Sequence, residues 1–273
     1  MSPDNSIPGR YLTFALLDSL VTAPRAELET SFIESSIRRI GPLVEFAYLD
    51  YSNAVARLPV TKGSDMINSL RTALKNPSIS DFPLTSSLNP NDFEFIRTFQ
   101  TEVEADDLRW MTFCKRLENA GVKAGLSQEF AKGLTGTVEE MASNVVEHSE
   151  HLETGIVGYR CSQTEFEYVV ADSGIGVLQS LRKNPYYSDL DDAGKALETA
   201  VQEGESRYGH NVGRGLGFRD LLQNIANMNS FLRFRSGDYR LVIDGLQSPP
   251  IWNTQPAQSF DGLLISIVSR QPQ

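Results

Sequence analysis

The chain has 273 residues, 40% of them hydrophobic, and a formal net charge of −10. This length supports one large domain or two modest ones, and the apolar content excludes a wholly disordered chain. The negative charge argues against nucleic acid as a direct partner and against anionic membranes, because both would repel the protein. It leaves room for a local basic pocket that binds a small anion.

Cysteine usage and the first residues predict the compartment. Cys114 and Cys161 form neither a CxxC pair nor a cluster with histidine at zinc-ligand spacing, so we expect two reduced, buried thiols. Asp4 lies where a signal peptide would be basic, and no apolar run approaches the ~20 residues of a membrane span. We therefore expect a soluble, cytoplasmic protein.

Residues 1–90 are predicted to be a mostly helical regulatory or interaction segment. Apolar residues recur at helical spacing in residues 26–40, 43–58 and 64–76, and no chemical motif stands out among them. Residues 76–92 are rich in Pro, Ser and Asn, which predicts a linker or long loop.

Residues 91–273 are predicted to form a second domain. Asn91 is the expected N-cap of a helical stretch over residues 91–121, which forms one long helix or two shorter ones. Ser127 is the expected N-cap of a helix over residues 127–149. The further predicted elements are strands at 154–160 and 165–172, helices at 192–204 and 216–229, and strands at 230–237, 239–245 and 262–269. This order predicts an α+β fold, a two-layer sandwich with helices on one face of a mixed, mainly antiparallel sheet.

Three polar residues of the helix at 127–149 follow one another at intervals of four. Glu140, Asn144 and His148 therefore lie on one helical face. Such a stripe is either solvated or directed at a ligand, and the stripe alone does not decide between the two.

Two glycine motifs follow. In DSGIG, residues 172–176, a carboxylate at a strand end can accept a hydrogen bond from an exocyclic amine, and glycines let backbone approach a flat ring. In GRGLGF, residues 213–218, glycines open a predicted helix whose N-terminal amides can bind phosphate. Each motif alone is also typical of an ordinary turn or loop. The second follows no strand and lacks GKS or GKT, so it is neither a dinucleotide fingerprint nor a P-loop.

In this order, the Glu/Asn helix, DxGxG and GxGLG resemble the GHKL superfamily of ATP-binding domains, which includes those of gyrase, MutL and histidine kinases. The resemblance extends from about residue 91 to 273, because FLRFRSGD and FDGLLISI resemble the strands that follow the phosphate-binding helix. The nearest subtype is the stand-alone bacterial domain related to anti-sigma-factor serine kinases, whose lid is similar to residues 196–209.

The resemblance implies a site for ATP and Mg²⁺. Asn144 would be the magnesium ligand, Asp172 would bind the adenine amino group, and Glu140 would be the general base. His148 would form part of the pocket wall. The residues implied to surround the base and the phosphates are Gly174, Gly176, Gly213, Arg214, Gly215, Leu216 and Gly217.

The sequence departs from the family pattern at two places. Leu263 follows Gly262 where the family has threonine, so a hydroxyl near adenine is missing. Glu147 stands where histidine kinases often have lysine, so phosphate charge must be met elsewhere. The candidate lid residues for that charge are Arg207, His210 and Arg214.

Two functions stay open. The first is an ATPase or a serine/threonine protein kinase that acts on a partner in bacterial signalling, with Glu140 as its main support. The second is a non-catalytic interaction module whose lid, residues 177–212, closes on ATP and controls dimerisation or partner binding. Retention of the Asn, the Asp and the glycines argues against a degenerate structural domain. A conventional histidine autokinase is excluded because His148, His151 and His210 all lie within the ATP-binding part.

Overall fold

The structure is a computed structural model, and it describes residues 12–22, 39–52, 65–76, 84–88, 91–98, 107–203, 230–245 and 250–270. The described helices are α1 (Phe14–Thr22), α3 (Ile40–Tyr51), α4 (Asp65–Lys75), α6 (Leu108–Lys123), α7 (Gln128–His148), α8 (Gly176–Arg182) and α9 (Ala193–Glu203), with the short 3-10 helices η1 (Leu152–Thr154) and η2 (Pro185–Tyr187). The strands are β1 (Leu84–Leu88), β2 (Asn91–Arg97), β3 (Ile156–Cys161), β4 (Glu165–Asp172), β5 (Ser230–Asp244) and β6 (Ile251–Arg270).

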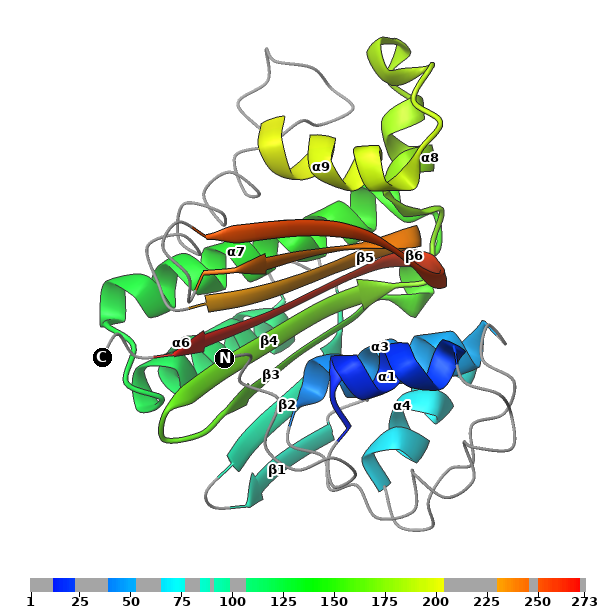
Figure 1. Cartoon of the computed structure of the whole chain (residues 1–273). Helices are drawn as coiled ribbons and strands as arrows, with labels where there is room; N and C mark the ends of the chain where they lie inside the picture. Colours follow the sequence, from blue (N-terminus) through cyan, green and yellow to red (C-terminus); the bar gives the residue numbers. More distant parts are fainter. Residues whose placement is uncertain are drawn as a thin grey trace.

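The six strands form one sheet in the order β1-β2-β3-β4-β6-β5, and every neighbouring pair is antiparallel. Figure 1 shows α6, α7 and α9 on one side of this sheet. The predicted α+β class, with helices packed on an antiparallel sheet, is confirmed. The strands predicted at 154–160 and 165–172 are also present, as β3 and β4.

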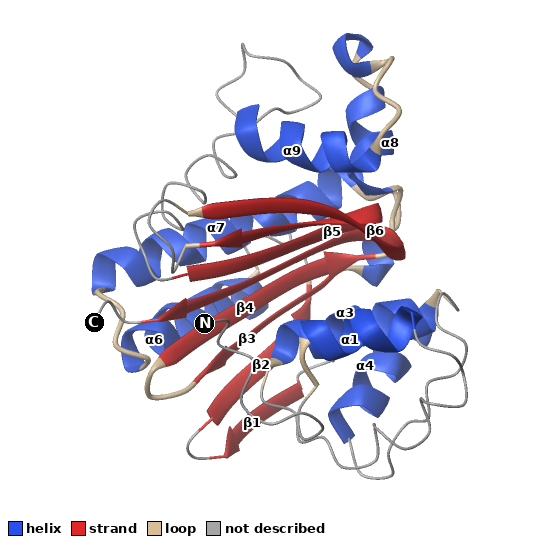
Figure 2. Ribbon diagram, in the orientation of Figure 1, coloured by secondary structure: helices blue, strands red, loops and turns tan. Residues whose placement is uncertain are grey.

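The central strand β4 is buried on both faces. Tyr168 and Val170 belong to the core under α6, α7 and α9, whereas Val169 and Ala171 belong to a second core formed with α1, α3 and α4. Side chains alternate between the two faces of a strand, so a strand covered on both sides needs a continuous apolar run. The N-terminal helices therefore form a third layer on the opposite face of the same sheet (Figure 2).

Helix α3 is the centre of this N-terminal layer. All residues from Ile40 to Leu49 are buried. The helix begins on a buried carboxylate of β4, because Glu167 accepts hydrogen bonds from the backbone N–H groups of Ile40 (3.0 Å) and Gly41 (2.8 Å). Burial raises the pKa of Glu167, and the two amides and nearby Arg39 act in the opposite direction. A carboxylate at this position satisfies N–H groups that have no partner inside the helix.

Two predicted elements differ from the structure. Asn91 is the first residue of strand β2 and pairs with Leu88, so it is not a helix N-cap, and the helix begins only after Asp107. The expected linker over residues 76–92 contains β1. The alternation of polar and aromatic residues in NDFEF has the period of a strand, and pairing with β1 and β3 selects that conformation.

Other predictions meet the structure only in part. The two strands predicted at 230–237 and 239–245 are one strand, β5, which ends at Asp244 and contains Gly237 at φ +60°. Just beyond its end, Gly245 N donates to Ser230 O (2.9 Å). Most of the helix predicted at 26–40, and all of the helix predicted at 216–229, lie outside the described residues. Both cysteines are buried, as predicted. Within the described ranges, none of the helices combines the length and apolar character needed to cross a bilayer.

Candidate functional site

Helix α7 carries the polar stripe found in the sequence. The predicted N-cap is confirmed, because Ser127 Oγ accepts a hydrogen bond from Phe130 N (3.2 Å). Val138, Met141, Ala142 and Val145 are buried and anchor the helix on the sheet. This apolar face fixes the orientation of the residues beside it.

Glu140, Asn144 and His148 lie at the flank of that buried face and are each partly exposed. Asn144 Nδ2 lies 3.9 Å from Met141 Sδ, which is a weak contact for an amide. With the nitrogen directed to sulfur, the amide oxygen is the stronger group that Asn144 can offer to a ligand. The stripe is therefore neither fully solvated nor part of the core.

Strand β4 ends in the DSGIG turn with a buried carboxyl group. Asp172 is 2% exposed, and its Oδ1 accepts a hydrogen bond from Gly174 N (2.7 Å). Burial raises the pKa of Asp172 to about 7, while the Gly174 amide and His151 act in the opposite direction. A carboxyl group with this pKa is poised between its neutral and ionised forms at neutral pH.

The turn packs against the C-terminal end of α7. Ile175 N donates to the carbonyl oxygen of Ser149, the C-cap residue of α7 (2.9 Å), and Ser173 N donates to Thr154 Oγ1 (2.9 Å). A Cβ atom at Gly174 would lie 2.1 Å from Ser149 O, so this close approach requires glycine. The structure therefore brings Asp172 next to the helix that carries Asn144. Asn144 is five residues before Ser149, a rise of about 7.5 Å along the helix axis.

On its other side the turn rests on β6 at Gly262. Gly262 has φ +82°, and a Cβ atom there would lie 2.2 Å from Asp172 O. Ser236 Oγ donates to Gly262 O (2.7 Å) and accepts from Val177 N (2.9 Å), so it joins β5, β6 and the start of α8. Gly176 also has positive φ, +75°, beside the same hydroxyl.

Ser149, Thr154 and Ser236 support the turn but were not predicted as site residues. Their signal in the sequence is weak: Ser149 directly follows the polar stripe, Thr154 lies five residues further on, and Ser236 follows Arg235 in β5. Hydroxyl groups of this kind commonly bond to backbone in turns, so the residue types alone do not identify a site.

The phosphate part of the predicted site is not described. Gly213, Arg214, Gly215, Leu216 and Gly217 lie outside the described residues, as do Arg207 and His210. Among the residues that are described, no group of three or more His, Cys, Asp or Glu could hold a metal ion.

The described half of the site is a buried carboxyl group framed by glycine backbone, at the end of a helix with a partly exposed amide. The second oxygen of this carboxyl group can accept a hydrogen bond from an amine, and the glycines beside it allow the close backbone packing of the turn. No protein-family model matches the chain, and a search of curated proteins finds no match either.

Proposed function

We propose that the protein binds ATP with Mg²⁺ at the Asp172 turn, and that it hydrolyses the nucleotide or transfers its γ-phosphate to a partner protein. The observation that carries this proposal is the buried carboxyl group of Asp172 in the DSGIG turn, where only Oδ1 has a hydrogen bond described, from Gly174 N. The resemblance of the motifs to GHKL domains supports the same assignment.

Asp172 would select adenine. Its Oδ1 already accepts from Gly174 N, so Oδ2 would accept from the exocyclic amino group of the base. A hydrogen bond to an ionised acceptor is stronger in a buried site than in water. Guanine has a carbonyl oxygen at the corresponding ring position, and two acceptors would face each other there. ATP should therefore bind and GTP should not.

Asn144 and Glu140 would act at the phosphate end. A single amide oxygen fits Mg²⁺, which usually keeps several waters and takes few protein ligands beside substrate phosphates. Mg²⁺ held by Asn144 would supply positive charge beside the phosphates. Glu140, one turn earlier on α7, would orient and deprotonate the attacking hydroxyl or water. Gly213, Gly215, Leu216 and Gly217 would surround the phosphates, and Arg214 would supply positive charge.

A second candidate is a nucleotide-gated interaction module without catalysis, acting through a protein partner or a homodimer. The observation that favours it is the position of α8, which starts inside the turn at Gly176 and is tied to β5 through Val177 N. A segment anchored directly on the base-binding turn can transmit nucleotide occupancy to a lid.

Calorimetric titration tests nucleotide binding, and an assay of phosphate release or transfer separates the two candidates. ATP with Mg²⁺ should bind saturably to the wild type, Asp172→Asn should weaken binding with or without magnesium, and Asn144→Ala should remove only the magnesium-dependent part. Glu140→Gln should bind ATP normally and lose phosphate release or transfer, whereas a wild type that never turns over ATP would favour the gated module. Absence of ATP binding by the wild type would refute both candidates.

A further inference from the structure

Helix α3 reaches the candidate site from the opposite face of the sheet. Glu45 and Tyr48 are 0% and 2% exposed and are three residues apart, so they lie on one face of the helix, directed at the sheet. Both side chains bond to residues adjacent to the Asp172 turn, by two separate routes.

The first route runs through the hydroxyl group of Tyr48. Tyr48 Oη lies 2.5 Å from Thr154 O and 3.0 Å from Ala171 O, and its single hydrogen is shared between these two carbonyls. Ala171 directly precedes Asp172, and Thr154 Oγ1 accepts from Ser173 N. Burial raises the pKa of Tyr48 well above its usual value, so the hydroxyl keeps its proton and remains a donor. One side chain of α3 thus supports the turn from both of its flanks.

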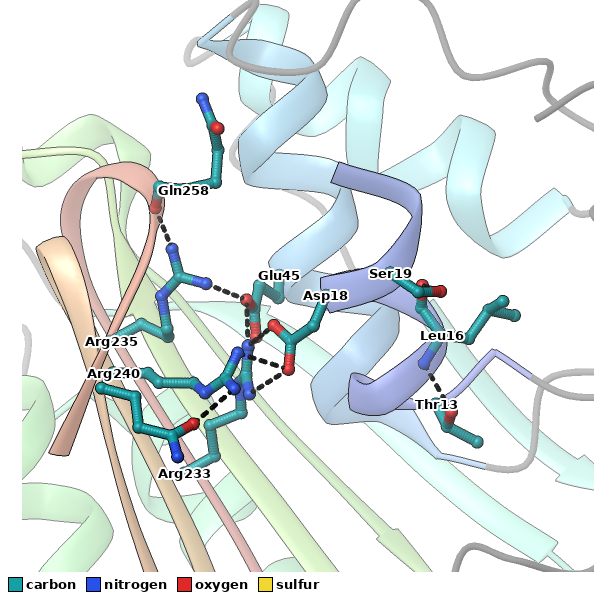
Figure 3. A network of polar contacts seen from close by, with 10 residues as sticks. Thr13, Leu16, Asp18, Ser19, Glu45, Arg233, Arg235, Arg240 and Gln258 are labelled. Atoms are coloured by element: carbon teal, nitrogen blue, oxygen red, sulfur yellow. Dashed lines mark hydrogen bonds and ion pairs between the residues drawn. The ribbon is translucent and has the colours of Figure 1, made fainter. Parts of the chain in front are cut away.

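The second route runs through a buried ion network (Figure 3). Glu45 accepts from Arg233 Nε (2.7 Å) and Nη2 (2.8 Å) and from Arg235 Nη1 (2.7 Å). Arg235 is followed in β5 by Ser236, whose hydroxyl group joins Gly262 O to Val177 N. Glu45 therefore fixes the stretch of β5 that supports the other side of the turn.

Helix α1 completes the same network. Asp18 accepts from Arg233 Nη2 (2.7 Å) and pairs with Arg240 Nη1 (2.7 Å), and the Arg233 guanidinium lies 4.5 Å from the centre of the Phe14 ring. In Figure 3, Asp18 points from α1 into the arginine cluster. Without Asp18, Glu45 alone would neutralise the two buried guanidinium groups of Arg233 and Arg235. An uncompensated buried charge is costly, so the network favours the docked position of α1.

We propose that the N-terminal layer regulates the nucleotide site: α3 transmits the docking state of α1 to the Asp172 turn through Tyr48 and Glu45. This inference rests on the proposed ATP site. With α1 docked, α3 holds the turn in the geometry described above. Release of α1 disturbs the charge balance around Glu45, shifts α3 and lowers the affinity for ATP. By linkage, ATP stabilises the docked position of α1 by the same factor.

Hydrogen exchange on the wild-type chain tests the coupling without any substitution. Saturating ATP with Mg²⁺ should slow amide exchange in α1 and α3, although neither helix contributes a residue to the proposed ATP contacts. Unchanged exchange in both helices, in a protein that binds ATP, would overturn the regulatory proposal and leave the ATP site intact. A wild type that does not bind ATP would instead remove the proposed function, and this inference with it.

Matched variants test the two routes. Asp18→Asn and Tyr48→Phe should each weaken ATP binding by about fivefold or more, the usual lower range of coupling between sites. Ser19→Ala is the control for α1, because Ser19 is exposed and points away from the cluster in Figure 3. Tyr168→Phe is the control for Tyr48, because the Tyr168 hydroxyl is buried without a hydrogen-bond partner on the other face of β4.

The double variant decides whether α1 acts through Tyr48. If it does, Asp18→Asn combined with Tyr48→Phe should weaken ATP binding by less than the product of the two single effects. Circular dichroism and thermal melting compare each variant with its control, so that loss of folding is separated from loss of affinity. Control-like ATP affinity in a folded Asp18→Asn protein would overturn the regulatory role of α1.

Discussion

Replacing Asp172 by asparagine should stabilise the folded protein while removing its proposed ATP contact. The pKa of this buried carboxyl rises to about 7 from a reference value of 3.8. Each pKa unit corresponds to about 1.4 kcal/mol, so keeping Asp172 in the folded state costs on the order of 4 kcal/mol at pH 8. Asparagine keeps an oxygen for the Gly174 amide and has no proton to lose, so it avoids this cost.

The cost of Asp172 has a defined pH window. Below about pH 3 the folded and unfolded states both hold the proton, and no penalty arises. Between about pH 4 and 7 the unfolded state loses the proton while the folded state retains it, so the wild type loses stability as pH rises. Above about pH 8 both states are ionised and the penalty is constant. The gap between Asp172→Asn and wild type should therefore start near zero and grow to about 4 kcal/mol.

Urea unfolding at pH 4, 6 and 8 measures this gap. Trp110 is buried, so its fluorescence should report unfolding of the core under α6 and α7. Groups that titrate equally in both proteins cancel in the difference, which isolates Asp172. A variant less stable than wild type at pH 8, or a gap that does not change with pH, would refute the view that this carboxyl is buried at an energetic cost.

Three further substitutions test the packing around the site. Gly262→Ala should lower the free energy of unfolding by about 1–3 kcal/mol and abolish ATP binding, because its Cβ would lie 2.2 Å from Asp172 O at a positive φ. A thermal melt and an ATP titration measure the two effects, and an unaffected protein would contradict the close packing of Gly262 on the Asp172 turn. A Cβ atom at Gly133 in α7 would meet open space, so Gly133→Ala should raise the free energy of unfolding by about 0.5–1 kcal/mol and raise the melting temperature. A lower melting temperature would contradict the open space around Gly133. Glu45→Ala should lower the free energy of unfolding, measured with urea, by about 3–5 kcal/mol, because it leaves two buried arginines without their shared carboxylate. A loss below about 1 kcal/mol would mean that water reaches these arginines.

The sequence was sufficient where a local pattern determines the structure. The cap at Ser127, the helical stripe of α7 and the strand that ends at Asp172 are all encoded within a few neighbouring residues, and all three are confirmed. Residues 91–97 were wrongly predicted as helix because NDFEFIR is short and apolar enough to suit either conformation. Its strand geometry depends on pairing with β3, more than fifty residues away in the chain, and local periodicity does not encode such a partner.

Of the candidate site, the sequence predicted the residues proposed to contact the ligand but not the residues that support them. Asp172 and its glycines have a recognisable spacing, but their supports come from distant segments. Ser236 bonds to Val177 N across 59 residues, and Tyr48 bonds to Ala171 O across 123. A tyrosine within an apolar helical pattern is most often a core residue, so nothing local marks Tyr48 as a support of the site. The role of the N-terminal helices follows from packing alone.

The burial of β4 on both faces has a consequence for any attempt to shorten the protein. A fragment starting at residue 91 would lose α1, α3 and α4, and with them the cover over Phe95, Ile156, Val169 and Ala171. It would also leave the Glu167 carboxylate without the two amides that it caps, and β2 without its hairpin partner β1. Such a truncation should give insoluble material. The smallest unit worth expressing for crystallography or inhibitor screening therefore includes the N-terminal helices.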